Sequence, residues 1–242
     1  MSRYKRFLVF QHMHWEGPGV HLRRSAESVG IQLDVVEVWQ QPIPEVSSYQ
    51  GLIVLGGSPN VDQEEEYPFL KDEKIAVQKV IEADKSYLGF CLGHQLLADV
   101  LGARVGPNFC RSVGFIEGQL TSEGLRHPLF QGIPSTLPLF KWHSQAALAP
   151  LPDRVEVLVT SRDCEVEAIS VNGQPHIVGL QFDNHAATRV DAATWLDGDK
   201  DWLSQPPVVN PATVLRDAER LESLMAEHFQ VLFENFVQLE SQ

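Results

Sequence analysis

Short apolar runs alternate with helical patterns through the first hundred residues, and this alternation limits the possible folds more than any other feature. Helices are predicted between and after the runs over 19–29, 69–84 and 93–101, where apolar residues recur at helical spacing. Strands that alternate with helices form a parallel sheet with helices on both faces, so we expect a doubly wound α/β fold. The runs themselves, rich in β-branched residues or Phe, predict strands at 7–10, 33–38, 52–55 and 87–90.

The second half of the chain has a different pattern, in which apolar runs follow one another with turns between them. Runs at 155–160, 166–171 and 177–182, with the turn VNGQ at 171–174, predict hairpin strands that extend the same sheet in antiparallel fashion.

The segment PVVNP at 207–211 is the one clear break in the chain. Asn210 is a good helix cap and Pro211 a good first helical residue. Beyond them, apolar residues recur every three or four positions, which predicts a helix packed on the body of the protein. We therefore expect an α/β domain over 1–205 and a C-terminal helical extension over 206–242.

Composition excludes several classes of function. Asp and Glu number 32 against 19 Lys and Arg, and a net charge of -13 argues against nucleic acid as a partner. Three scattered cysteines without a CxxC pair suit neither a disulfide framework nor a cysteine zinc site. No run is long enough for a membrane span or a signal-peptide core, so we expect a cytoplasmic protein with reduced thiols. No Walker-type loop or G-x-G-x-x-G is present, and we expect no cofactor.

Gly89-Phe90-Cys91-Leu92-Gly93 places a cysteine between a predicted strand and a predicted helix. A strand that turns sharply into a helix exposes its turn residue, and the flanking glycines allow the backbone to close without Cβ clashes. Cys91 would then lie at a helix N-terminus, where the dipole favours a thiolate. The Leu92 N–H would point at a developing oxyanion. The pattern predicts a nucleophile, and a buried structural cysteine is the alternative.

A glycine pair, Gly56-Gly57, follows the strand predicted at 52–55. This turn would lie at the same carboxyl edge of the sheet as Cys91, where ligands bind in parallel sheets. The Gly57 N–H is therefore our candidate for the second oxyanion donor, and a plain turn is the alternative.

Taken together, GFCLGHQ, the preceding LGG and the later VGLQF resemble class I glutamine amidotransferase domains, and most closely the stand-alone GMP-synthase-like members. The resemblance implies a flavodoxin-like fold in which the cysteine attacks the side-chain amide of glutamine, ammonia leaves, and water resolves the thioester. The chain has no room for a fused synthetase domain, so we expect that the acceptor of any ammonia is on another protein, or that the ammonia is simply released. The assignments that the resemblance implies are Cys91 as nucleophile, Leu92 and Gly57 as oxyanion donors, Gln95 as a substrate ligand, and Ser112, Gly114 and Phe115 as backbone contacts to glutamine.

One motif departs from the family's pattern. The family has Q-F-H-P-E, whose histidine is the base, whereas this chain has Gln181-Phe182-Asp183-Asn184-His185. A carboxylate beside a thiolate raises the cysteine pKa and predicts a weak or inactive site. Alternatively, a shifted loop brings His185 to Cys91 with Asp183 orienting it, or His143 serves as the base.

Three hypotheses of function follow. The first is a glutaminase acting on glutamine or a related γ-glutamyl compound through Cys91. The second is a cysteine hydrolase of the α/β-hydrolase kind, because the G-x-C-x-G turn is shared. The third is an impaired homologue that binds a ligand or regulates a partner. A metal at His12-x-His14 is disfavoured because no third ligand stands out. The oligomeric state is not indicated.

Overall fold

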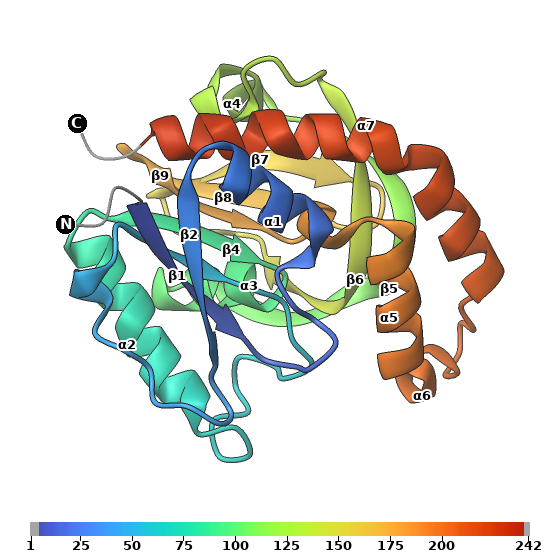
Figure 1. Cartoon of the computed structure of the whole chain (residues 1–242), viewed down its shortest axis with the longest axis horizontal. Helices are drawn as coiled ribbons and strands as arrows, with labels where there is room; N and C mark the ends of the chain where they lie inside the picture. The colour runs from blue at the N-terminus through green and yellow to red at the C-terminus, as the bar shows by residue number, and fades with distance from the viewer. Residues whose placement is uncertain (1–4, 240–242) are drawn as a thin grey trace.

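The computed structural model describes residues 5–239, and these form a single mixed β-sheet with helices on both faces (Figure 1). The nine strands of this part follow the spatial order β2-β1-β3-β4-β9-β8-β7-β5-β6. The strands are β1 (Lys5–Gln11), β2 (Ile31–Glu37), β3 (Gly51–Val54), β4 (Ser86–Phe90), β5 (Arg104–Leu120), β6 (Thr136–Leu148), β7 (Val155–Ser161), β8 (Ala168–Val171) and β9 (Gln174–Leu180).

The parallel part of the sheet consists of β2, β1, β3, β4 and β9. Strand β9 joins the two parts, because it runs parallel to β4 on one side and antiparallel to β8 on the other. The sequence therefore predicted the doubly wound fold and its antiparallel extension correctly. The β8–β9 connection turns at Asn172 and Gly173, as the VNGQ pattern indicated.

Helices cover both faces of the sheet. The α1 and α7 helices lie on one face, and α2 and α3 lie on the other (Figure 1). Among the described residues, no helix is long and apolar enough to cross a membrane. The helices are α1 (Gly19–Ser28), α2 (Phe69–Glu82), α3 (Leu92–Val100), α4 (Ser122–Arg126), α5 (Arg189–Gly198), α6 (Lys200–Leu203) and α7 (Pro211–Gln238), with short 3₁₀ turns at η1 (Val46–Ser48), η2 (Pro128–Phe130) and η3 (Asn184–Ala186).

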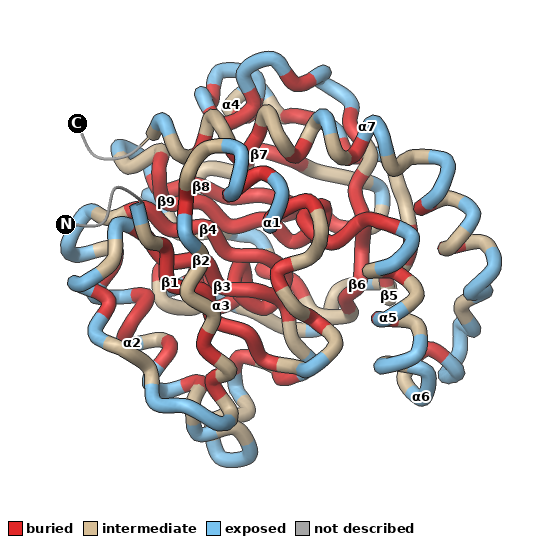
Figure 2. Tube along the Cα trace, in the orientation of Figure 1, coloured by how far each residue is buried: buried red, intermediate tan, exposed pale blue. Residues whose placement is uncertain are grey.

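Strand β1 illustrates why the central strands are continuous apolar runs. Phe7 and Val9 belong to the core cluster on the α1/α7 face, whereas Leu8 and Phe10 belong to the cluster on the α2/α3 face. All four side chains are fully buried (Figure 2). Because the strand is covered on both faces, both sets of alternating side chains must be apolar.

The segment between 102 and 154 contains two strands that the sequence analysis did not predict. Strands β5 and β6 form a long antiparallel pair at the edge of the sheet. Gly106, Pro107, Gly114 and Gly118 interrupt the apolar pattern of β5, and the pairing is irregular between Pro107 and Ser112. Glycine and proline are poor strand residues, which explains why no clear strand pattern appears there.

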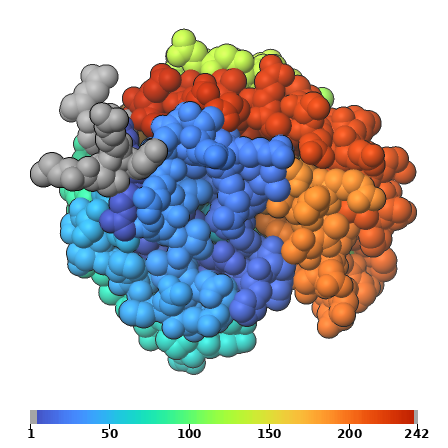
Figure 3. Space-filling view, viewed as in Figure 1, coloured from blue at the N-terminus to red at the C-terminus, as the bar shows by residue number. Residues whose placement is uncertain are grey.

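The C-terminal helix α7 begins as predicted, with the Asn210 side chain accepting a hydrogen bond from the Ala212 N–H. It packs on the body of the protein, beside α1 (Figure 3). Phe229, Phe233 and Phe236 of α7 share a core cluster with residues of β1 and β4, so α7 is continuous with the core of the rest of the described chain.

Replacing Phe233 by Ala tests this shared core. Phe233 is fully buried, and Phe233→Ala should lower the free energy of unfolding by about 3 to 5 kcal/mol through lost burial and a cavity. Leu224→Ala on the same helix is the control, because Leu224 is 41% exposed and should cost far less. Urea denaturation monitored by circular dichroism measures both. A loss below about 1 kcal/mol for Phe233→Ala would show that α7 is not part of the core.

Candidate active site

Cys91 occupies a strained turn between β4 and α3, as the glycine pattern predicted. Its backbone has φ 45° and ψ -101°, a conformation that few residues other than glycine adopt. A Cβ on Gly93 would lie 2.2 Å from the Val54 carbonyl oxygen, and one on Gly89 would lie 2.5 Å from the Gly93 carbonyl. Only glycines at these positions allow β3, β4 and α3 to approach closely enough to form the turn.

The Cys91 side chain lies at the wall of a cavity of about 170 Å³ and is 8% exposed. The adjacent Leu92 N–H lowers the pKa of the Cys91 thiol, and Sγ lies 3.8 Å from the Trp142 carbonyl oxygen. The cavity lies at the carboxyl edge of the sheet, as predicted. Its lining comprises Glu16, residues 57–60, Cys91, Gln95, residues 142–145, Asp199 and Trp202.

Two further predicted site residues line this cavity. The Gln95 Nε2 donates to the Gln145 carbonyl at 3.0 Å and to Gln181 Oε1 at 3.2 Å, which fixes its amide in the wall. Gly57 lies between His12 and Leu92, where a Cβ would come within 2.7 Å of the His12 Cβ. Their roles as substrate ligand and oxyanion donor stay predictions.

Two buried carboxylates approach the thiol. A Cβ on Gly56 would lie 2.9 Å from Glu16 Oε2, 3.4 Å from the Cys91 Cβ and 3.5 Å from Asp183 Oδ1, so all three side chains meet around Gly56. Burial raises the pKa of Cys91 well above its ordinary value, and the charges of Asp183 and Glu16 raise it further. Burial also raises the pKa of Asp183 well above its ordinary value. The resting site therefore favours a protonated thiol.

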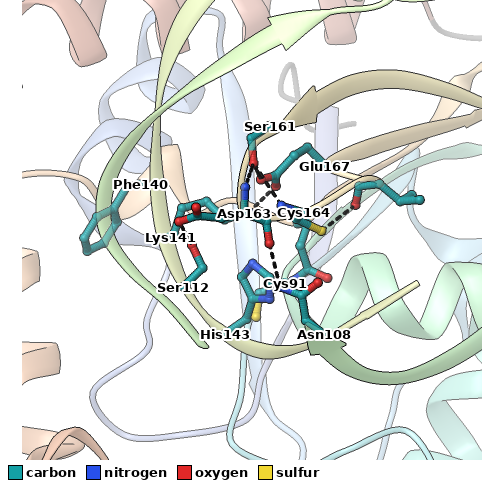
Figure 4. Close-up of polar contacts among 12 residues, drawn as sticks. Cys91, Asn108, Ser112, Phe140, Lys141, His143, Ser161, Asp163, Cys164 and Glu167 are labelled. Carbon is teal, nitrogen blue, oxygen red and sulfur yellow. Dashed lines mark hydrogen bonds and ion pairs between the residues drawn. The ribbon is translucent and has the colours of Figure 1, made fainter. Parts of the chain in front are cut away.

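A buried ion pair lies next to the cavity. The Lys141 ammonium pairs with the Glu167 carboxylate, and both side chains are fully buried. Glu167 also accepts a hydrogen bond of 2.6 Å from the Ser161 hydroxyl. Figure 4 shows this pair together with Cys91 and His143. The Lys141 charge lowers the pKa of both Asp183 and Cys91, which offsets part of the effect of burial.

Three residues predicted to contact glutamine do not line the Cys91 cavity. The Ser112 hydroxyl donates to Asp163 Oδ2 at 3.2 Å, beside the Lys141–Glu167 pair. Gly114 and Phe115 line a separate groove against residues 207–217, and the Phe115 ring stacks on Phe140. The three assignments stay predictions: Ser112 pairs with His143 of the cavity wall, whereas Gly114 and Phe115 pair with Lys141 and Phe140 farther along β6.

His185 lies in an aromatic core. Its ring packs 4.2 Å from the Phe90 ring and 6.2 Å from the Trp195 ring, measured between centroids. Neither ring nitrogen has a hydrogen-bond partner, and the nearest carboxylate oxygen, on Asp183, is 4.0 Å away. Burial lowers the pKa of His185 to about 3. The shifted loop that would join His185 to Cys91 by a hydrogen bond is therefore not present in this structure.

The other histidines divide by their surroundings. His143 lines the cavity, and its Nδ1 donates a hydrogen bond to the Gln145 carbonyl at 2.8 Å. Its Nε2 has no hydrogen-bond partner, and burial lowers the pKa of His143 well below the ordinary value. His12 is held by the Gly56 carbonyl at 2.7 Å and by Glu73 at 2.8 Å. Because both His12 nitrogens are engaged, the His12-x-His14 pair offers no metal site.

One buried group within the described chain has the spacing of metal ligands, namely His143, Cys164 and Glu167. Its donor atoms lie within 4.8 Å of one another. The Glu167 carboxylate is already engaged by Lys141 and Ser161, and burial raises the pKa of Cys164 to about 12. This group therefore suits an ion pair better than a metal.

The sequence analysis missed the acidic residues of the cavity. Glu16 follows the first strand and Asp199 follows α5, so both reach the carboxyl edge from segments far from Cys91. The position of Glu16 just beyond a strand end was a usable signal. Trp195 is a buried packing residue, whereas Trp202 lines the cavity.

Comparisons with known proteins agree with this geometry. The profile of the family described as "Glutamine amidotransferase class-I" matches residues 20–185. A glutamine amidotransferase-like protein of Salmonella typhimurium, YfeJ, is 31% identical over 158 residues, which are 63% of this chain and 65% of that protein. A glutamine-hydrolysing GMP synthase component from Methanothermobacter thermautotrophicus is 32% identical over 143 residues, 58% of this chain and 69% of that protein.

A solved structure of a glutamine amidotransferase from Thermotoga maritima superposes with a TM-score of 0.87 at 26% identity, covering 99% of this chain and 100% of that one. A glutamine amidotransferase from Methylobacillus flagellatus superposes with a TM-score of 0.86 at 20% identity, over 99% of this chain and 96% of that one, and this likeness concerns the fold. The chain belongs to the class I glutamine amidotransferase family.

Replacing His185 by Phe separates packing from catalysis. A neutral, unpaired histidine in an aromatic core gains little over Phe, so His185→Phe should be at least as stable as the wild type at pH 7. Unfolded His185 takes up a proton below its ordinary pKa of 6.5, whereas the folded side chain does so only near 3. Wild-type stability is therefore lost as the pH falls through this window, and the advantage of the variant should grow by about 1.4 kcal/mol per pH unit.

Urea denaturation from pH 7 to pH 4 checks this expectation. Val190→Phe, at a position that is 70% exposed, is the control; it introduces a Phe without removing a titrating group and should show no widening. A large loss of Cys91 reactivity in His185→Phe, at unchanged stability, would instead restore His185 as the partner of the thiol.

Proposed function

We propose that this protein hydrolyses the side-chain amide of a γ-glutamyl compound, glutamine or a substituted γ-glutamyl amide, through a thioester on Cys91. The observation that carries the proposal is the strained Cys91 turn, which opens into a cavity with the Leu92 N–H directed at the sulfur. Family membership supports the same chemistry. A strained nucleophile with an oxyanion donor beside it is the arrangement that acyl transfer needs.

Asp183 is the proposed proton acceptor, since it occupies the motif position of the family's histidine. Neither of its oxygens has a hydrogen-bond partner, and its carboxylate approaches Cys91 around Gly56. An ordinary carboxylate is too weak a base for a thiol, but burial raises the pKa of Asp183 well above its ordinary value. Burial therefore raises the pKa of the proton acceptor together with that of the thiol.

The reaction then proceeds in two steps. The Cys91 proton passes to Asp183 while Sγ attacks the amide carbon, and the N–H groups of Leu92 and Gly57 stabilise the oxyanion. The C–N bond breaks as Asp183 returns the proton to the departing nitrogen, which leaves a Cys91 thioester. Water then attacks the thioester, Asp183 accepts one proton of the water and passes it to sulfur, and the free thiol and a γ-carboxylic acid result; the acid releases its remaining proton to solvent. Relatives named as separate components of GMP synthase suggest that another protein uses the released nitrogen.

Cys91→Ser is the direct test of the nucleophile. Its turnover of glutamine and γ-glutamyl amides should fall by more than about a hundredfold, because the site has no base strong enough to deprotonate a serine hydroxyl. It should also lose covalent labelling by a glutamine-like diazoketone, located by peptide mass. Cys164 is a built-in control, because it is fully buried with a raised pKa and should stay unlabelled. Turnover by Cys91→Ser at the wild-type rate would refute the proposal.

Asp183→Asn should separate thiol reactivity from turnover. Removing the Asp183 charge lowers the pKa of Cys91, so alkylation by iodoacetamide should shift to lower pH. Turnover should nevertheless fall by about 10² or more, because the proton acceptor is gone. Asp197→Asn, at an exposed position on α5, is the matched control for both measurements. If turnover survives in Asp183→Asn and is lost in His143→Asn, His143 is the base instead.

A second function has one observation in its favour. No described imidazole hydrogen bonds to Cys91, whose pKa is raised rather than lowered. A family member with such a site is suited to bind a γ-glutamyl ligand without hydrolysing it. Tight binding to the wild type without product release or thioester formation would favour this function.

A further inference from the structure

Glu16 carries a carboxylate that the fold buries without a partner. The residue is 5% exposed, lines the Cys91 cavity, and forms no side-chain hydrogen bond or ion pair with the rest of the described chain. Burial raises its pKa well above the ordinary value, the charges of Asp199 and Asp183 raise it further, and the charge of His12 offsets part of this effect. A buried carboxylate without a counter-ion is strongly unfavourable, so proteins rarely keep one without a use.

Two further carboxylates surround the same space. Asp199 lines the cavity at the junction of α5 and α6, and its Oδ2 accepts a hydrogen bond of 2.7 Å from Trp142 Nε1. The unpartnered Asp183 does not line the cavity but approaches Cys91 and Glu16 around Gly56. Two carboxylates from distant segments therefore line this small cavity, and a third is buried next to it.

The cations near the cavity are engaged elsewhere. Lys141 is paired with Glu167, and His12 is held by Glu73. Arg111 stacks on the Trp202 ring and donates to backbone carbonyls, including that of Trp202 at 2.7 Å. No lysine or arginine is among the cavity's lining residues in the part of the chain that the structure covers. Apart from the charge of His12, which is shared with Glu73, the carboxylates of the cavity thus have no cationic side chain beside them among the described residues.

We propose that the substrate supplies this counter-ion, as an ammonium group on the amine side of the scissile γ-glutamyl amide, bound between Glu16 and Asp199. The inference rests on the proposed function and narrows its substrate to γ-glutamyl amides of compact diamines. The volume of about 170 Å³ limits the amine to a short chain. The Trp142 side chain, fixed by its bond to Asp199, adds an aromatic wall that favours a cation.

Binding of an ammonium group would also prepare the nucleophile. The Glu16 charge is one of the causes that raise the pKa of Cys91. A cation beside Glu16 offsets this charge and favours the thiolate only when the substrate is present. This coupling explains how a cysteine without an imidazole partner is activated, and why free glutamine would be the poorer substrate.

A matched pair of ligands tests the proposal without turnover. Isothermal calorimetry on the Cys91→Ser protein compares γ-glutamyl N-(2-aminoethyl)amide, which carries the ammonium group, with γ-glutamyl N-propylamide, which has a methyl group in its place. The cationic amide should bind about tenfold or more tightly. Adding Glu16→Gln or Asp199→Asn should remove most of this difference, whereas Asp197→Asn, an exposed carboxylate two residues from Asp199, should leave it unchanged. Thermal unfolding confirms that each variant is folded.

Equal affinity for the two amides, or a preference that survives both Glu16→Gln and Asp199→Asn, would overturn the inference. Wild-type turnover of the same pair then separates it from the proposed function. Hydrolysis of both amides at equal rates, with equal affinity, overturns the ammonium site and leaves the amidase function intact. Selective binding of the cationic amide without hydrolysis supports the ammonium site and overturns the amidase function.

Discussion

The close approach of α3 to the β3 and β4 strands governs the geometry of this protein's site. Gly93 packs against the Val54 carbonyl and Gly89 packs against Gly93, so that the chain reverses within one residue. That residue, Cys91, absorbs the strain with a positive φ. The two core clusters, which pack on both faces of the parallel strands, stabilise this strained conformation. The rigid sheet thereby fixes the sulfur at the edge where the cavity opens.

Electrostatics around the sulfur distinguish this family member. An imidazole at position 183 would share the proton of Cys91, whereas the buried carboxylate of Asp183 opposes the thiolate. The charge of Lys141, which pairs with Glu167, offsets part of the effect of burial by lowering the pKa of Asp183. The remaining negative charge lies on the cavity side, on Glu16 and Asp199, where a ligand can reach it. In the proposed ammonium site, this charge pattern would link the departure in the motif to the choice of ligand.

Most of the fold could be read from the sequence, because the parallel core produces strong local patterns. Strands buried on both faces, such as β1, are continuous apolar runs, and the Cys91 turn has glycines where a Cβ cannot fit. The β5 strand escaped prediction, since its glycines and Pro107 lack a strand pattern and its pairing with β6 is irregular. Its course also explains why Gly114 and Phe115 do not line the cavity.

The sequence by itself determined the doubly wound core, the capped C-terminal helix and the strained cysteine, since each depends on residues close together in the chain. The tertiary structure decided what surrounds that cysteine. His185 packs against Phe90 and Trp195, although its place in the motif suggested a catalytic role. Glu16 and Asp199 lie more than a hundred residues apart in the chain and meet at one cavity. Burial and long-range charge, which set the pKa of the thiol, exist only once the chain has folded.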